Sequence, residues 1–272
     1  MVGAVAVSIE YPHDPRLADY ADLRTPRGAD WFVVESVLAV QRLLTSPYPV
    51  RSLLVTPAGY ERVATDLDGR DVAVFVAPLD VLREVVGFNL HRGVLASAGR
   101  LPLADVDALI GGSARRIVVL DGLNDQENIG AIARNARALG ADALLLDPSC
   151  ADPLNRRSVR VSMGEILHVP LVRATRWPDA LTTLRGAGIE VWALTPHAGA
   201  VPIGDLHPPA RLALLVGAEG PGLGEASIAA SSAAVRIPIR AEVDSLNVAH
   251  AVSVALALTT TASGCPGADS PS

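Results

Sequence analysis

Asn128-Ile129-Gly130-Ala131-Ile132-Ala133-Arg134 follows an apolar, strand-like run just before the middle of the chain, and two further motifs downstream repeat this placement. They are Gly217-Ala218-Glu219-Gly220-Pro221-Gly222 and the pair of Ile237-Pro238 with Ser245-Leu246-Asn247-Val248. Each motif therefore opens a loop at the end of a predicted strand. Their shared placement predicts that all three motifs contribute to ligand binding.

From residue 117 onward the chain contains six continuous apolar runs of strand length, separated by helix-length segments. These runs cover residues 117–120, 143–146, 169–172, 191–194, 212–216 and 235–239. Strands buried on both faces have this composition, which predicts an α/β fold with a parallel sheet and helices on both sides. Ligands bind beyond the carboxyl ends of such strands, where the three motifs are expected to lie.

Together the three motifs resemble the signature motifs of the SpoU/TrmH family of RNA 2′-O-ribose methyltransferases, over roughly residues 115–262. The resemblance implies the SPOUT superfamily fold, in which the parallel sheet contains a deep trefoil knot. It also implies S-adenosylmethionine as the cofactor, structured RNA as the partner and a homodimer as the assembly. True knots are rare in proteins, so this expectation rests on the resemblance alone.

The resemblance implies catalytic roles for Asn128, Arg134, Glu219, Ser245 and Asn247. Arg134 is expected beside the target ribose. A guanidinium keeps its proton up to about pH 12, so positioning the hydroxyl and its phosphate suits it better than acting as a base. In the local pattern, Asn128 and Ser245 are candidate N-caps of the helices that follow.

For the cofactor, the resemblance implies binding by the loops at Thr195, Gly217, Ile237 and Leu246, mostly through the backbone. Glycine at position 217 permits close approach, so a side chain there is expected to block binding. Methyl transfer from a sulfonium depends on holding the reactants in a dry pocket more than on acid–base chemistry. We therefore expect no metal.

The first half of the chain alternates between short helix-like and strand-like segments. Helices are expected over 33–45, 57–66 and 78–86, and strands over 52–56, 72–77 and 93–98. This half is similar to the L30e-like substrate-binding domain of many family members; the alternative is a generic α/β module that only extends the core. The expected boundaries are 1–110 for the L30e-like domain, 111–114 for a linker, 115–264 for the methyltransferase domain and 265–272 for a flexible tail.

All 23 basic residues are arginine, because the chain contains no lysine. This excludes a Schiff-base lysine and a P-loop lysine. The net charge of −6 argues against general nucleic-acid binding but leaves room for a local basic surface. Arg156, Arg157 and Arg160 form such a cluster and are candidate RNA contacts; the alternative is ordinary solvated charge.

Two cysteines, Cys150 and Cys265, are too few for a disulfide framework or a four-ligand zinc site. The first residues lack the basic segment of a secretory signal. The apolar run over 248–262 is too short to cross a bilayer. We therefore expect a cytoplasmic protein with no membrane partner.

Several functions stay open at this point. The leading prediction is methylation of a ribose 2′-hydroxyl in ribosomal RNA (23S), with transfer RNA as an alternative substrate. A catalytically silent RNA-binding or ribosome-assembly factor on the same fold is a second class, which the presence of all five polar site residues disfavours. A nicotinamide-dependent oxidoreductase is remote, because Asp121-Gly122-Leu123-Asn124 after the first strand lacks the G-x-G-x-x-G turn.

Overall fold

The computed structural model describes residues 6–23, 30–90 and 93–260. The chain divides into two compact units. The first unit comprises Met1–Pro102 and Leu154–His168, and the second comprises Leu103–Pro153 and Val169–Ser272. Both units therefore take segments from more than one stretch of the sequence.

The first unit is built on a five-stranded mixed sheet. Its strands are β1 (Ala6–Ser8), β2 (Trp31–Glu35), β3 (Val50–Val55), β4 (Ala73–Val76) and β5 (Val94–Gly99), in the spatial order β1-β4-β3-β5-β2. Strands β1, β4 and β3 are parallel, whereas β5 is antiparallel to both β3 and β2. Its helices are η1 (Pro15–Tyr20), α1 (Val37–Leu44), α2 (Pro57–Val63), η2 (Ala64–Leu67), α3 (Leu79–Val86), α6 (Arg156–Val161) and η3 (Glu165–His168).

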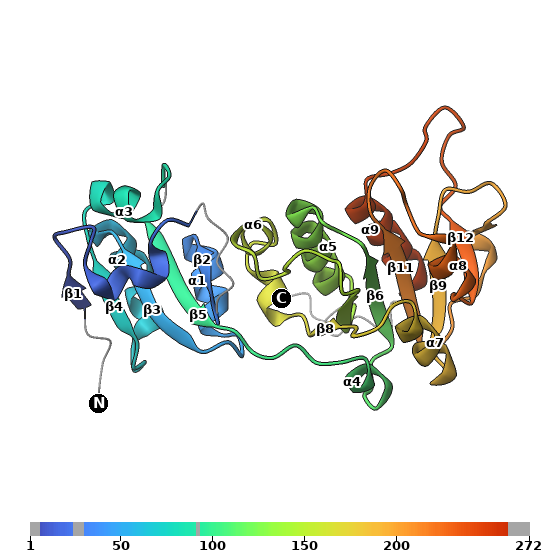
Figure 1. Ribbon diagram of the computed structural model, residues 1–272, viewed down its shortest axis with the longest axis horizontal. Helices are drawn as coiled ribbons and strands as arrows, with labels where there is room; N and C mark the ends of the chain where they lie inside the picture. The colour runs from blue at the N-terminus through green and yellow to red at the C-terminus, as the bar shows by residue number, and fades with distance from the viewer. Residues whose placement is uncertain (1–5, 24–29, 91–92, 261–272) are drawn as a thin grey trace, which may run out of the picture. The chain divides into compact units, whose positions relative to one another are not determined.

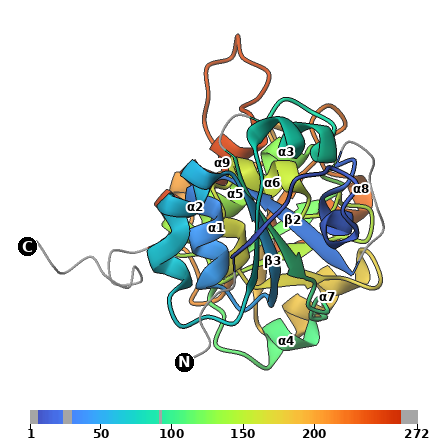
Figure 2. The same ribbon diagram turned by 90° about the vertical axis from the view of Figure 1, so that its left-hand side faces the viewer.

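Helices cover both faces of this sheet. Helices α1 and α2 pack against each other (Figure 2). Helix α3 and η1 cover the other face, where Tyr20, Leu82 and Val86 are buried in one apolar cluster with Leu54 and Leu95 of the sheet. The prediction that this part of the chain combines helices with a sheet in a small α/β module is thus confirmed.

The helix predicted over 33–45 is wrong in its first part, because Trp31–Glu35 forms strand β2. This segment is aromatic and β-branched, and pairing with β5 decides its conformation. Helix α1 begins only after Ser36, whose hydroxyl accepts a hydrogen bond from the Ala39 amide at 3.4 Å. The apolar spacing of this segment fits either a helix or a strand, and its pairing with β5 selects the strand.

The second unit contains a seven-stranded sheet (Figure 1). Its strands are β6 (Arg116–Asp121), β7 (Ala143–Leu146), β8 (Leu171–Arg173), β9 (Glu190–Leu194), β10 (Val201–Pro202), β11 (Leu212–Gly217) and β12 (Ala233–Arg236), in the order β10-β12-β9-β11-β6-β7-β8. All neighbouring pairs are parallel, which confirms the predicted parallel sheet. Its helices are α4 (Asp107–Ile110), α5 (Gln126–Ala138), α7 (Asp179–Gly186), η4 (Ile203–Asp205), α8 (Glu225–Ala229) and α9 (Val248–Thr259).

Helices also cover both faces of the second sheet. On one face, α4, α7 and α8 pack on a cluster that includes Val119, Leu145 and Leu215. On the other face, α5 and α9 pack against each other (Figure 1). Asn135 of α5 donates to the Ala249 carbonyl of α9 at 3.3 Å and ties the two helices together.

Two boundaries differ from the expected organisation. Leu109 of α4 is buried in the core of the second unit, so the region just before 111–114 belongs with the parallel sheet. Leu154–His168 belongs to the first unit although it lies far along the chain. Cys265 and the tail predicted over 265–272 lie outside the described residues.

Arg156 anchors the α6 segment to the first unit. Its guanidinium forms an ion pair with Glu35 of β2 at 2.6 Å and lies 4.2 Å from the centre of the Phe88 ring. Arg157 and Arg160 of the same helix are exposed. The basic cluster predicted from the sequence therefore consists of Arg156, which holds α6 in place, and the exposed Arg157 and Arg160. All three belong to the first unit.

Candidate functional site

The three sequence motifs converge at the carboxyl edge of the parallel sheet. Strand β11 lies between β9 and β6, and Gly217 at its end pairs in register with Asp121 at the end of β6. A cavity of about 960 Å³ opens at this edge. Its lining comes from four segments: Leu194–His197, Val216–Ile228, Ile237–Ile239 and Asp244–Ala251.

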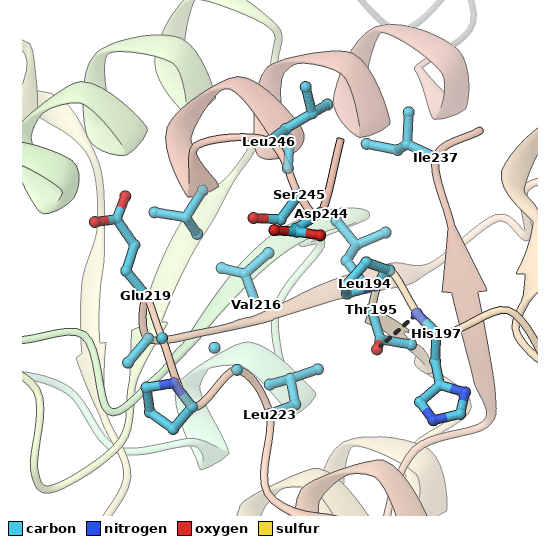
Figure 3. Close-up of a pocket in the computed structure, with 18 of the residues that line it drawn as sticks. Leu194, Thr195, His197, Val216, Glu219, Leu223, Ile237, Asp244, Ser245 and Leu246 are labelled. Atoms are coloured by element: carbon cyan, nitrogen blue, oxygen red, sulfur yellow. Dashed lines mark hydrogen bonds between the residues drawn. The ribbon is translucent and has the colours of Figure 1, made fainter. Parts of the chain in front are cut away.

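All four predicted cofactor residues line this cavity. They are Thr195, Gly217, Ile237 and Leu246. Figure 3 shows Leu246 and Ile237 at one side of the cavity and Leu223 of the glycine-rich loop at the opposite side. Aliphatic side chains therefore provide most of the walls, with backbone groups of the loops exposed between them.

The sixth predicted strand ends earlier than expected, and this matters for the cavity. The apolar run over 235–239 was expected to stay in the sheet, but β12 ends at Arg236. Ile237 and Ile239 then lie in the cavity lining. Their apolar side chains form part of the cavity wall and do not pack in the sheet. Strand periodicity in the sequence cannot distinguish these two locations.

The glycine-rich loop closes as a tight turn. The Gly222 amide donates to the Ala218 carbonyl at 3.0 Å, and Gly220 and Gly222 adopt φ values of 88° and 69°. Positive φ is strained for residues with a side chain, so this turn requires glycine. A Cβ atom at Gly217 would lie only 2.4 Å from the carbonyl carbon and oxygen of Gly222.

Asn247 links the three motifs through its side chain. Its amide nitrogen donates to Asn128 Oδ1 and to Glu219 Oε1, both at 2.9 Å. Its own oxygen accepts from the Ala249 amide at 3.0 Å and caps helix α9. One asparagine thus fixes the position of residues from all three motifs.

Both predicted N-caps are wrong. Helix α5 begins after Asp125, whose carboxylate accepts from the Glu127 amide at 2.8 Å, so Asn128 lies inside the first turn. Helix α9 begins after Asn247 and not at Ser245. Asn128 is only 7% exposed. Because it does not cap the helix, its side-chain oxygen accepts the hydrogen bond from Asn247. Ser245 lines the cavity.

The structure does not bring the predicted arginines into the cavity lining. Arg134 is exposed on α5, and within the described residues it has no carboxylate partner. Arg156, Arg157 and Arg160 belong to the other unit. The single chain therefore assembles Asn128, Glu219, Ser245 and Asn247 at one place and leaves the cationic groups outside it.

Sequence reasoning missed a pair of neighbouring carboxyl groups, Asp121 and Asp147, at the carboxyl ends of β6 and β7. Asp147, 2% exposed, accepts from the amides of Gly122 and Ser149 and from that of Cys150 at 3.1 Å. Burial, together with the neighbouring Asp147, raises the pKa of Asp121. Asp121 is the last residue of β6 and Asp147 comes directly after the adjacent strand β7, so strand-end position was the available signal.

The cavity lining is acidic. Glu219, Glu225 and Asp244 contribute three carboxylates, and no arginine is part of the lining. His197 is the other ionisable group there; its amide donates to the Thr195 hydroxyl at 3.4 Å (Figure 3). A cationic ligand is favoured in such a cavity over an anionic one.

Neither a metal-binding cluster nor a membrane-spanning helix is present in the part of the chain that the structure describes. No group of three or more histidine, cysteine, aspartate or glutamate side chains there is placed to hold a metal ion. Among the same residues, none of the helices has the length and apolar character needed to span a bilayer.

Known proteins are similar to this chain in sequence. An uncharacterized tRNA/rRNA methyltransferase of Mycobacterium tuberculosis is 44% identical over 254 residues, which cover 90% of this chain and 88% of the relative. The 23S rRNA (guanosine(2553)-2'-O)-methyltransferase of Bacillus subtilis is 26% identical over 249 residues, 90% of this chain and 96% of the relative.

The fold has solved counterparts as well. The SpoU methyltransferase AviRb from Streptomyces viridochromogenes, solved in complex with the cofactor AdoMet, superposes with a TM-score of 0.78. It is 28% identical, and the match covers 90% of this chain and 97% of that protein. The sequence pattern of the SpoU rRNA Methylase family matches residues 115–257, the region that contains all three motifs and the cavity. The chain therefore belongs to the SpoU rRNA methylase family.

Proposed function

We propose that this protein is an S-adenosylmethionine-dependent methyltransferase that modifies a ribose 2′-hydroxyl of structured RNA. The carrying observation is the hydrogen-bonded group of Asn128, Glu219 and Asn247 at the rim of a cavity built from the glycine-rich loop. Family membership and the AdoMet-bound relative support the same reaction. Ribosomal RNA of the large subunit (23S) is the leading substrate, as in the Bacillus subtilis relative.

The cavity suits S-adenosylmethionine by volume, surface and charge. Its volume of about 960 Å³ lies within the range of ligand pockets, roughly 300–1,000 Å³. Leu223, Ile237 and Leu246 offer apolar surface for the adenosine part, and the acidic lining suits a cation. Thr195, Gly217, Ile237 and Leu246 would hold the cofactor, largely through backbone groups.

In the proposed mechanism the bound cofactor supplies an electrophilic methyl group, and this chain orients the acceptor. Asn247 fixes Glu219 and Asn128, so these groups are already in place when RNA arrives. Ser245, at the same rim, offers a hydroxyl toward the ligand. Preorganised polar groups of this kind reduce the cost of ordering the reactants.

Arg134 is proposed to position the ribose hydroxyl and its adjoining phosphate. It is exposed on α5, the helix that also carries Asn128, so RNA seated at the cavity could reach both. Its permanent charge and planar donor array suit a phosphate and a developing oxyanion better than proton abstraction.

Arg134→Ala is expected to retain cofactor binding and to lower methyl transfer by a factor of about 100 or more, as when one preorganised donor is removed. Arg134→Lys should restore little, because lysine lacks the planar fork. Calorimetry with S-adenosylmethionine and initial rates on the RNA substrate measure the two effects. Arg137→Ala, another exposed position on the same helix, is the control and should keep near-normal rates. Normal rates in Arg134→Ala would remove this residue from the mechanism.

The first unit is proposed to be an L30e-like domain that binds the RNA substrate. Its mixed sheet with helices on both faces is compatible with that fold. Arg157 and Arg160 are exposed on α6 and would contact phosphates, while Arg156 holds the helix in place through Glu35 and Phe88. Phosphate contacts by arginine supply affinity without sequence preference.

A trefoil knot and a homodimer are also part of the proposal. After β12 the chain continues into helix α9, which packs on α5, and the Thr260 hydroxyl donates to the Leu139 carbonyl at 3.4 Å. Both features are compatible with a knotted chain end. Val254 and Leu258 of α9 are 37% and 55% exposed, and a second protomer would cover them. Cytoplasmic location, expected for an RNA-modifying enzyme, stays a prediction.

Mapping of 2′-O-methylated positions in ribosomal and transfer RNA, from cells with and without the protein, tests the function. We expect one position in 23S ribosomal RNA to lose its methyl group without the protein. Loss from transfer RNA alone would establish the alternative substrate. An unchanged methylation map, with the protein still binding RNA, would mean a catalytically silent factor.

A further inference from the structure

The acidic side chains of the cavity lining have no cationic partner among the residues that the structure describes. Glu219, Glu225 and Asp244 line the cavity, and within the described part of the chain none of the three pairs with an arginine or histidine. Glu219 accepts a hydrogen bond from the neutral side-chain amide of Asn247. The three carboxylates therefore give the cavity lining a negative charge. A bound cation would be stabilised by that charge.

The substrate and the product of the proposed reaction differ in charge. During methyl transfer the electron pair of the broken carbon–sulfur bond stays on sulfur, the methyl group bonds to the ribose oxygen, and the hydroxyl proton is released. S-adenosylhomocysteine, the product, therefore carries one positive charge less than S-adenosylmethionine. Nearly every other group on the two molecules is the same, so charge is the feature that a binding site can use to distinguish them.

We infer that Asp244 is a specificity-determining residue that favours the sulfonium form of the cofactor over its neutral product. This inference rests on the proposed function. The cavity and the glycine-rich loop form the binding site. The carboxylate of Asp244 raises the affinity of this site for a positively charged ligand relative to a neutral one. The consequence is weaker product binding, which promotes product release after each turnover.

Asp244 suits this role better than the other two carboxylates. Glu219 is held by Asn247 and belongs to the proposed catalytic group. Glu225 is in the first turn of α8, whose backbone amides offset part of its charge. Asp244 precedes Ser245 and Leu246 on the loop that forms one side of the cavity, and Figure 3 shows it beside Ser245.

The size of the effect follows from Coulomb's law. Two unit charges about 4 Å apart attract by roughly 1 kcal/mol in water and more in a less polar surrounding, and 1 kcal/mol corresponds to about a fivefold change in affinity. Asp244 is exposed, so the lower end applies. We therefore expect Asp244→Asn to weaken S-adenosylmethionine binding about fivefold and to leave S-adenosylhomocysteine binding nearly unchanged.

Isothermal titration calorimetry of the full-length protein with both ligands tests this inference directly. The control is Glu242→Gln, the same loss of one charge on an exposed residue of the same loop that is not part of the cavity lining. The control should keep the wild-type affinity ratio of the two ligands. Repeating the wild-type titrations at about 1 M salt should shrink the ratio, because the Debye length falls to about 3 Å.

Three outcomes would overturn the inference. Equal weakening of both ligands by Asp244→Asn would mean that Asp244 binds the amino group they share. An unchanged ratio in Asp244→Asn would mean that it does not sense the sulfur. An equal change of the ratio in Glu242→Gln would mean that only overall charge matters. Failure of the proposed function gives a different result, because the wild-type protein would then bind neither ligand.

Discussion

Gly217→Ala is expected to abolish measurable binding of S-adenosylmethionine. From the sequence, a side chain at this position was expected to obstruct the cofactor. The structure gives a different reason: the added Cβ would lie 2.4 Å from the carbonyl carbon and oxygen of Gly222 and 2.6 Å from the Leu223 nitrogen. These are backbone atoms, so no rotamer change can relieve the overlap. The turn from Ala218 to Gly222 must open, and one wall of the cavity is lost.

The same substitution should destabilise the protein by about 1–3 kcal/mol, the usual cost of overpacking. Calorimetry measures the loss of binding, and urea unfolding measures the stability. Gly224→Ala is the matched control, because a Cβ there meets no atom within 4 Å and the backbone φ of −67° suits any residue. It should bind the cofactor normally. Full affinity and stability in Gly217→Ala would show that the turn does not form the binding wall.

A substrate RNA with a single 2′-deoxy substitution at the mapped target nucleotide is expected to accept no methyl group. The 2′-hydroxyl is the proposed acceptor, and it is also the group that distinguishes RNA from DNA. Phosphates remain unchanged, so binding of this RNA should persist at near-normal affinity because phosphate contacts dominate affinity. Transfer of labelled methyl from S-adenosylmethionine, followed by a binding titration, separates the two effects.

The control is the same RNA with the deoxy substitution at the neighbouring nucleotide, which should still be methylated. Labelled methyl appearing on the deoxy target itself would mean that the acceptor is a base atom. The ribose assignment would then be abandoned, while the cofactor assignment would stand.

The strands around the site were predictable because burial on both faces leaves a strong local signal. Residues 143–146 were placed correctly at both ends, as β7 shows. The run over 235–239 was not, because an apolar side chain has the same character in a sheet and in a cavity wall. Only the path of the chain after Arg236 decides between them.

For the polar site residues, too, the sequence predicted one part and the tertiary structure decided the other. The sequence identified Asn128, Ser245 and Asn247 by type, yet it assigned the helix caps to the wrong residues. Asparagine, aspartate and serine are all good N-caps, so local chemistry cannot choose among several candidates within a few positions. In the structure, Asp125 and Asn247 cap the helices, and the Asn128 side chain is left to bond across to Asn247.

The sequence by itself determined the parallel sheet, the three motifs at its carboxyl edge and the family to which they belong. These features depend on residues close together in the chain. Tertiary structure alone decided that Asn247 joins Asn128 and Glu219, that Asp121 lies beside Asp147, and that α6 packs on the first unit. Such contacts join segments that are far apart along the chain. Their partners are set by packing and strand order, which no local pattern records.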